Sequence, residues 1–118
     1  MTDSWPTELR LGNGGRTLTV TFDSGDRFEL AAEYLRVESP SAEVKGHGPG
    51  QEQLVWGKRN VRILRLDPVG TYAVKAVFDD GHNTGLFTWS YLLKLGRERD
   101  ALWPAYLERL AAAKLDRG

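Results

Sequence analysis

The residues best suited to chemistry gather in one short turn, where Asp79 and Asp80 precede Gly81 and His82. Two carboxylates and an imidazole on one turn are suitable ligands for a divalent metal such as zinc or ferrous iron. The same residues also suit a plain chain reversal, in which the aspartates and the glycine form the turn and the histidine is a surface or hydrogen-bonded residue. The sequence alone favours the plain turn over the metal site.

The only other histidine is His47, which lies in the glycine- and proline-rich stretch 46–51. No serine has the context of a catalytic triad, and the absence of cysteine excludes thiolate metal sites and cysteine nucleophiles. The glycines around His47 do not form a phosphate-binding loop, because no Gly-Lys-Ser/Thr sequence follows them. The familiar motifs of catalysis are therefore not found around either histidine.

A hairpin and a helix must position the Asp79–His82 turn. One apolar run ends at Phe78 and a second extends to Phe87, so the turn is expected to join two antiparallel strands. Thr88 suits the N-cap position, which predicts a helix starting directly after the second strand. Gly96 is expected to end that helix as a C-cap.

The same arrangement occurs earlier in the chain, which predicts a repeated structural unit. Residues 20–26 match residues 76–82 position by position, and each set precedes a strand and a helix that contains a Tyr-Leu pair. Two copies are too few for a solenoid, so we predict that both units pack into one domain. Chance similarity between two hairpins is the alternative explanation.

The complete pattern predicts a single α+β domain over residues 1–118. Alternating apolar residues indicate an antiparallel β-sheet of about six strands, with a helix after each hairpin and a C-terminal helix packed across the sheet. Asp100 is expected to cap that last helix, and Pro104 to lie in its first turn. Residues 38–60 have no periodicity, which predicts either a functional, partner-facing loop or a plain linker.

Charge and composition narrow the classes of partner. Sixteen basic and 16 acidic side chains cancel, so no global field would draw the chain to nucleic acid or to a membrane surface. The basic cluster 58–62, together with Arg65, is interpreted as the solvent-facing side of a strand, with nucleic-acid binding as the alternative. The N-terminal residues resemble neither a signal peptide nor a membrane span, so we expect cytoplasmic residence.

Three motifs, in order along the chain, carry a resemblance to a known family. They are Tyr34-Leu35-Arg36-Val37-Glu38-Ser39-Pro40-Ser41-Ala42-Glu43-Val44, then Gly46-His47-Gly48-Pro49-Gly50-Gln51, and finally Asp80-Gly81-His82-x-Thr84-Gly85-x-Phe87-x-Trp89-x-Tyr91-Leu92. The chain resembles the gamma-butyrobetaine hydroxylase-like N-terminal domain family, formerly DUF971, over nearly its whole length. Related domains precede the catalytic domain of carnitine-biosynthesis dioxygenases or are attached to P-loop ATPases that carry iron–sulfur clusters. The bacterial stand-alone form, which this chain resembles, has no settled activity.

The resemblance implies that a family zinc site is lost here. In the hydroxylases, the domain holds a structural zinc ion through three cysteines and one later histidine. On this chain the cysteine positions fall on Ser39, Ser41 and Val44, and the histidine position falls on His82. Serine is a poor zinc ligand at neutral pH and valine is none, so we expect no tetrahedral structural site of that kind.

We expect no enzymatic activity, because the dioxygenase chemistry belongs to a catalytic domain that the resemblance does not include, and two site hypotheses follow. The first is a non-catalytic adaptor whose loop and turn contact a protein partner connected with iron or iron–sulfur metabolism. That surface comprises Ser39, Pro40, Ser41, Gly46, His47, Gly48, Pro49, Gly50, Gln51, Gly81, Thr84 and Gly85. The alternative is a protein that binds zinc or iron through His82 with His47 or a nearby carboxylate such as Asp80.

Overall fold

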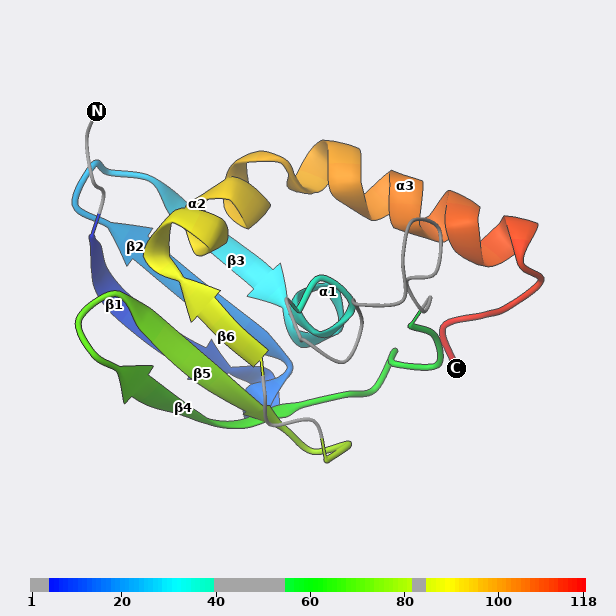
Figure 1. The fold of residues 1–118 in the computed structure, drawn as a ribbon, viewed down its shortest axis with the longest axis horizontal. Helices are drawn as coiled ribbons and strands as arrows, with labels where there is room; N and C mark the ends of the chain where they lie inside the picture. Colours follow the sequence, from blue (N-terminus) through cyan, green and yellow to red (C-terminus); the bar gives the residue numbers. More distant parts are fainter. Residues whose placement is uncertain (1–4, 40–54, 82–84) are drawn as a thin grey trace.

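The computed structural model describes residues 5–39, 55–81 and 85–118, which form two three-stranded antiparallel sheets and the helices that pack against them (Figure 1). The α+β class and the six antiparallel strands predicted from the sequence are confirmed, and the strands are divided equally between the two sheets. None of the helices formed by the described residues is long and apolar enough to cross a membrane.

The first sheet and the helix that follows it form the N-terminal unit. Its elements are β1 (Pro6–Gly12), the 3-10 helix η1 (Asn13–Gly15), β2 (Thr17–Phe22), β3 (Arg27–Ala31) and α1 (Ala32–Val37). In the central strand β2, the apolar side chains of Leu18, Val20 and Phe22 are buried and alternate with threonines on the opposite face. This alternation places one face of the sheet in the core and leaves the other in contact with solvent.

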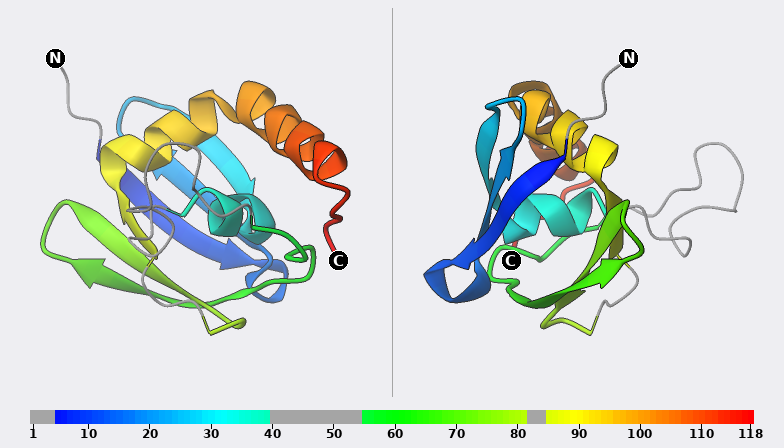
Figure 2. Two further views of the ribbon diagram at one scale, coloured as in Figure 1. Left: turned by 45° about the vertical axis from the view of Figure 1, so that its right-hand side comes forward. Right: turned by 90° about the vertical axis from the view of Figure 1, so that its left-hand side faces the viewer.

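The second sheet and its helix form the C-terminal unit. Its elements are β4 (Ile63–Val69), β5 (Ala73–Phe78), β6 (Gly85–Thr88) and α2 (Trp89–Arg97), and helix α3 (Arg99–Ala112) follows the unit. The predicted N-cap is confirmed, because the hydroxyl of Thr88 accepts a hydrogen bond from the backbone N–H of Tyr91 at 3.2 Å. Figure 2 shows the two sheets as separate layers, with α1 between them and with α2 and α3 following each other end to end above.

Matching hydrogen bonds in the two units confirm the predicted structural repeat. In the N-terminal unit, the Asp23 N–H donates to the carbonyl of Trp5, and the Trp5 N–H donates to Oδ1 of Asp23. In the C-terminal unit, Asp79 and Arg62 exchange the same two bonds. Each first strand also carries a register shift close to its start, between Pro6 and Glu8 in β1 and at the equivalent place in β4. Such agreement in detail exceeds a general likeness between hairpins.

Two buried tyrosines relate the units to each other. The hydroxyl of Tyr34 in α1 donates to the carbonyl oxygen of Leu95 in α2 at 2.7 Å, and the hydroxyl of Tyr91 in α2 donates to the carbonyl oxygen of Glu38 after α1 at 2.6 Å. The two donors lie as far apart in sequence as the two acceptors do, so they occupy equivalent positions in the two units. Each unit therefore donates to the other the same hydrogen bond that it accepts. This reciprocity is the mark of an approximate two-fold axis, as in a symmetric dimer interface.

Helix α2 continues past the position predicted to end it. The prediction that Gly96 is a C-cap is wrong, because α2 extends to Arg97. Gly96 instead allows close packing: a Cβ atom at this position would lie 2.3 Å from Cδ2 of Phe28 in β3. The glycine therefore lets the second helix pack directly on the first sheet.

The start of helix α3 also differs from the prediction. Asp100 is not the N-cap, since α3 begins at Arg99 and the N-cap is Glu98, whose carbonyl accepts bonds from the N–H groups of Ala101 and Leu102. Pro104 lies inside the helix, beyond its first turn. Because α3 follows α2 with a single residue between them, the helix starts earlier than its own sequence indicates. Tyr106 and Leu110 form the buried side of α3.

Candidate functional site

The structure describes four of the residues predicted to form a site, namely Asp80, Ser39, Gly81 and Gly85. The remaining predicted residues lie outside the described part of the chain. They are His47 and His82 of the metal hypothesis, Val44 of the family zinc positions, and Pro40, Ser41, Gly46, Gly48, Pro49, Gly50, Gln51 and Thr84 of the predicted partner-binding surface. The described residues of the candidate site are those at which these segments begin and end.

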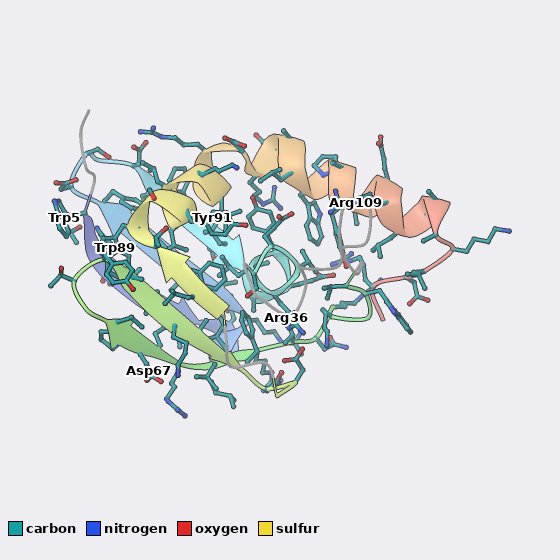
Figure 3. All side chains as sticks on the ribbon, viewed as in Figure 1. Trp5, Arg36, Asp67, Trp89, Tyr91 and Arg109 are labelled. Atoms are coloured by element: carbon teal, nitrogen blue, oxygen red, sulfur yellow. The ribbon has the colours of Figure 1, made fainter. Side chains whose placement is uncertain are left out.

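Asp80 joins three separate parts of the chain. Its Oδ2 accepts a hydrogen bond from Nε of Arg36 in α1 at 2.9 Å and forms an ion pair with Nζ of Lys58 at 2.6 Å. The side chains are only 13% (Arg36), 18% (Asp80) and 23% (Lys58) exposed, so solvent screens this triad less than an ordinary surface pair. Figure 3 shows Arg36 on the side of α1 that faces the end of β5.

The triad brings together the ends of the two segments predicted to form the partner-binding surface. Ser39 lies three residues after Arg36 and is buried, and Gly81 directly follows Asp80. The segments that begin after these residues therefore start from one place on the molecule. The resemblance predicted that the two segments share one surface. The ion triad was not predicted, because Arg36 and Asp80 are 44 residues apart in sequence.

Asp79 has the structural role that the simpler interpretation of the turn gave it. Its Oδ1 accepts the N–H of Arg62 at 3.0 Å, and its own N–H donates to the Arg62 carbonyl at 2.9 Å. A side-chain oxygen that accepts a backbone N–H at the end of a strand replaces the bond that a neighbouring strand would make. Asp79 is thus engaged in holding the hairpin to the preceding segment.

The donor set does not fit the structural zinc site of the hydroxylase domains. Of the four family positions, three carry serine or valine in this chain, which cannot supply thiolate ligands. Within residues 5–39, 55–81 and 85–118, no three Asp, Glu or His side chains are grouped closely enough to hold a metal ion. Asp80 is already bound to two cations, and a metal ion would have to compete with both of them for its charge.

A C-terminal clamp, defined here as Glu33, Trp103 and Arg117, fixes the other side of the site. The Arg117 guanidinium binds the carboxylate of Glu33 through two hydrogen bonds of 2.9 and 2.8 Å and lies over the Trp103 ring, 5.5 Å from its centroid. Glu33 is only 5% exposed. The bidentate bond to Glu33 raises the pKa of Arg117, so the guanidinium keeps its charge.

The clamp also holds the backbone of the segment that contains Lys58. Gly57 and Arg59 donate their N–H groups to the carbonyl oxygens of Asp116 and Arg117, at 3.0 and 2.7 Å. Neither this pairing nor the clamp was predicted. One signal existed, because Glu33 interrupts an otherwise apolar helical run, and a buried carboxylate requires a partner.

Residues 58–62 do not form the solvent-facing side of a strand, so that interpretation of the basic cluster is wrong. Strand β4 begins at Ile63, and of the cluster only Arg65 lies in it. Hydrogen bonds to the C-terminal tail and to Asp79 occupy the backbone of this segment in place of a neighbouring strand. The cations therefore lie on an extended connection between the clamp and β4 (Figure 1).

Glu38 is a half-buried acid that directly follows α1. Burial raises the pKa of its carboxyl, and the positive charges of Arg109 and Lys94 offset part of that rise. Burial and the Glu38 charge together raise the pKa of Tyr91 to about 12, so this tyrosine remains a neutral hydrogen-bond donor. Tyr91 is thus suited to a structural role at neutral pH, as the donor to the carbonyl oxygen of Glu38.

Comparisons with known proteins agree with this fold. The model of the family described as gamma-butyrobetaine hydroxylase-like, N-terminal, matches residues 9–93. Two NMR solution structures resemble the chain with TM-scores of 0.84 and 0.82 at 45% and 50% identity; the matches cover 98% and 99% of this chain and 91% and 90% of those chains. None of the curated proteins matches it.

A crystal structure provides a third comparison. It is that of a protein of unknown function from Acidithiobacillus ferrooxidans, which belongs to the DUF971 family. The two chains are 42% identical, with a TM-score of 0.64, and the match covers 77% of this chain and 91% of that one.

Proposed function

The chain belongs to the gamma-butyrobetaine hydroxylase-like N-terminal family, also called DUF971, and we propose that it is a non-catalytic adaptor that binds a protein partner. The observation that carries this proposal is the Asp80 triad, which joins the starting points of two segments that the sequence assigns to one surface. Tyr34, Tyr91, Asp79 and the clamp are all engaged in holding the fold together. These contacts support a rigid platform for recognition.

The finer parts of the proposal come from the family resemblance. It connects the partner with iron or iron–sulfur metabolism, whereas cytoplasmic residence is proposed from the sequence alone. The proposed surface comprises residues 39–51 with residues 81–85. Asp80 holds the starting points of the two parts close together through its bonds to Arg36 and Lys58. Neither nucleic acid nor a membrane is proposed as a partner, since the net charge of the chain is zero.

Site-specific photo-crosslinking in cells tests the adaptor function. A photoreactive amino acid is placed at Ser41 or Gln51, with Glu29 on the exposed face of the first sheet as the matched control position. We expect discrete crosslinked species from the first two positions only, and a lower yield when Asp80→Ala removes the triad. Crosslinks of the same pattern from all three positions, or from none, would contradict the adaptor function.

Metal binding is the alternative function, through His82 with His47 or Asp80. The adaptor is preferred because Asp80 would have to exchange two cations for a metal ion. Zinc, or ferrous iron under anaerobic conditions, is titrated into the isotopically labelled, tag-free protein while the imidazole signals are followed. The chain has only these two histidines, so saturable shifts confined to them and to Asp80 would favour the metal function. Unchanged spectra would exclude it.

A further inference from the structure

The connection 55–62 carries an exposed aromatic ring and several cations, and we call Trp56, Lys58, Arg59 and Arg62 the basic strip. Trp56 is 52% exposed, although tryptophan is usually buried over most of its surface. Single exposed apolar residues are common and need no explanation on their own. This tryptophan differs because hydrogen bonds fix the backbone around it and the exposed cations Arg59 and Arg62 follow it.

Hydrogen bonds on both sides of Trp56 fix the backbone of the basic strip. The hydroxyl of Tyr106 donates to the Val55 carbonyl at 2.8 Å, directly before Trp56. The N–H groups of Gly57 and Arg59 donate to the C-terminal tail, directly after it. The backbone of this segment is therefore fixed by hydrogen bonds, as in a strand, although the segment belongs to neither sheet. Little conformational entropy would be lost there on binding, which is a property of preorganised recognition sites.

The basic strip has more positive charge than its surroundings neutralise. Arg59 and Arg62 are exposed and form no ion pair with any residue in the described ranges. Lys58 and Arg36 share the single charge of Asp80. Because the whole chain is neutral, this excess is local. Positive charge beside a half-exposed tryptophan matches the residue types, arginine and tryptophan, that dominate binding energy at protein interfaces.

We propose that the basic strip binds an acidic segment of a protein partner. Carboxylates of the segment pair with Arg59 and Arg62, and an apolar side chain of the segment packs on Trp56. This inference rests on the proposed adaptor function and names the chemistry of its partner. A protein segment fits better than a nucleic acid, because the strip has one aromatic ring rather than a series of stacking platforms.

The test uses the full-length, isotopically labelled protein and a short glutamate-rich peptide that contains one leucine. We expect saturable shifts of the Trp56 indole N–H and of the Nε–H signals of Arg59 and Arg62, which weaken as salt is added. The double substitution Arg59→Glu with Arg62→Glu is expected to weaken binding about tenfold or more. Trp56→Ala is expected to weaken binding without unfolding the protein, because the ring is half exposed.

Matched controls separate the basic strip from general charge attraction. Arg27→Glu with Arg99→Glu makes the same change of charge at exposed positions outside the strip, and binding is expected to persist. Equal losses in both double variants, or no saturable shifts, would overturn the proposal. Tighter binding of a single-stranded oligonucleotide at the same signals would also overturn it and assign the strip to nucleic acid. Crosslinking from Ser41 and Gln51 does not depend on the chemistry of the peptide. If the acidic peptide does not bind but the crosslinks are still formed, this inference is wrong and the adaptor function is retained.

Discussion

The turns of the two units have the same backbone but different side-chain partners. In the N-terminal unit, Ser24 donates to Asp26 at 2.8 Å, and Arg97 of the opposite helix pairs with the same carboxylate. In the C-terminal unit, Asp80 takes the position of Ser24 and pairs with Arg36, which also comes from the opposite helix. The second turn also reaches the connection before β4, through Lys58. The candidate site thus lies at the turn whose side-chain contacts differ from those of its equivalent in the other unit.

The helices differ in the same way. Tyr34 and Tyr91 are equivalent and make reciprocal bonds, which belong to the shared scaffold. One residue earlier, the N-terminal unit has Glu33 and the C-terminal unit has Ser90. Glu33 is buried and paired with the C-terminal tail, whereas Ser90 is exposed. Residues shared by the units therefore maintain the fold, and residues that differ attach the segments around the site.

Breaking the clamp should have the largest effect on stability. Arg117→Ala leaves the buried carboxylate of Glu33 without its cation, and we expect a loss of roughly 3 kcal/mol in the free energy of unfolding. Ser90→Ala, at the position equivalent to Glu33, should change it by less than about 0.5 kcal/mol. Urea unfolding at neutral pH measures both values. Equal effects of the two substitutions would contradict the asymmetry described above.

Removing either tyrosine hydroxyl should lower the free energy of unfolding by a similar amount, because the two hydroxyls occupy equivalent positions in the two units. Tyr34→Phe and Tyr91→Phe each leave one carbonyl without its donor, and we expect losses of about 1–2 kcal/mol apiece. The two hydroxyls link the same pair of helices, so the double variant should differ from the sum of the single variants. A double-mutant cycle by urea unfolding measures this coupling. Strict additivity would argue against one shared helix–helix interface.

Much of the fold follows from local pattern, and the repeat was visible before the structure was known. The apolar alternation at Leu18, Val20 and Phe22 predicted β2, and the hydroxyl of Thr88 predicted the start of α2. Such features depend on residues close together in sequence. The predicted cap at Gly96 failed for the opposite reason: packing on Phe28 requires a glycine there, and the helix continues through it.

The candidate site was harder to predict because its contacts join distant residues. Arg36 meets Asp80, and Glu33 meets Arg117, across 44 and 84 residues of sequence. Nothing in one sequence specifies which arginine satisfies which carboxylate. The basic cluster was misinterpreted for a related reason, since its alternation matched a strand while its backbone pairs with the C-terminal tail. Pattern identified the charged segment, and only the tertiary structure identifies its partners.

The turn glycines offer a closer test of the shared scaffold. Gly25 and Gly81 both have a left-handed backbone, with φ of +95° and +92°, and neither would meet another atom within 4 Å if a Cβ were added. Gly25→Ala and Gly81→Ala should therefore each cost about 1 kcal/mol, from backbone strain alone. Thermal or urea unfolding of the two variants should give equal losses. A much larger loss for Gly81 would show that the second turn has packing that the first lacks.

The smallest expected effect concerns Glu38, which stands where the C-terminal unit has the core residue Leu95. Since burial raises the Glu38 pKa above 4.5, the unfolded chain loses this proton at lower pH than the folded protein does. The cost of the charge is therefore absent below the unfolded pKa, and stability falls as the pH rises through the folded pKa. Glu38→Gln removes that cost and should stabilise the protein at neutral pH by about 0.5 kcal/mol, a small gain because solvent screens a half-buried group.

The pH dependence distinguishes this cause from a change in packing. The advantage of Glu38→Gln should vanish below about pH 4, where the carboxyl is neutral in both states. Glu98→Gln provides the matched control, because Glu98 is exposed and its side chain does not cap α3. Urea unfolding of the three proteins at acidic and neutral pH measures the differences. A gain for Glu38→Gln that persists at acidic pH would locate its origin in packing beside Tyr91, and charge at this position would then have no part in distinguishing the units.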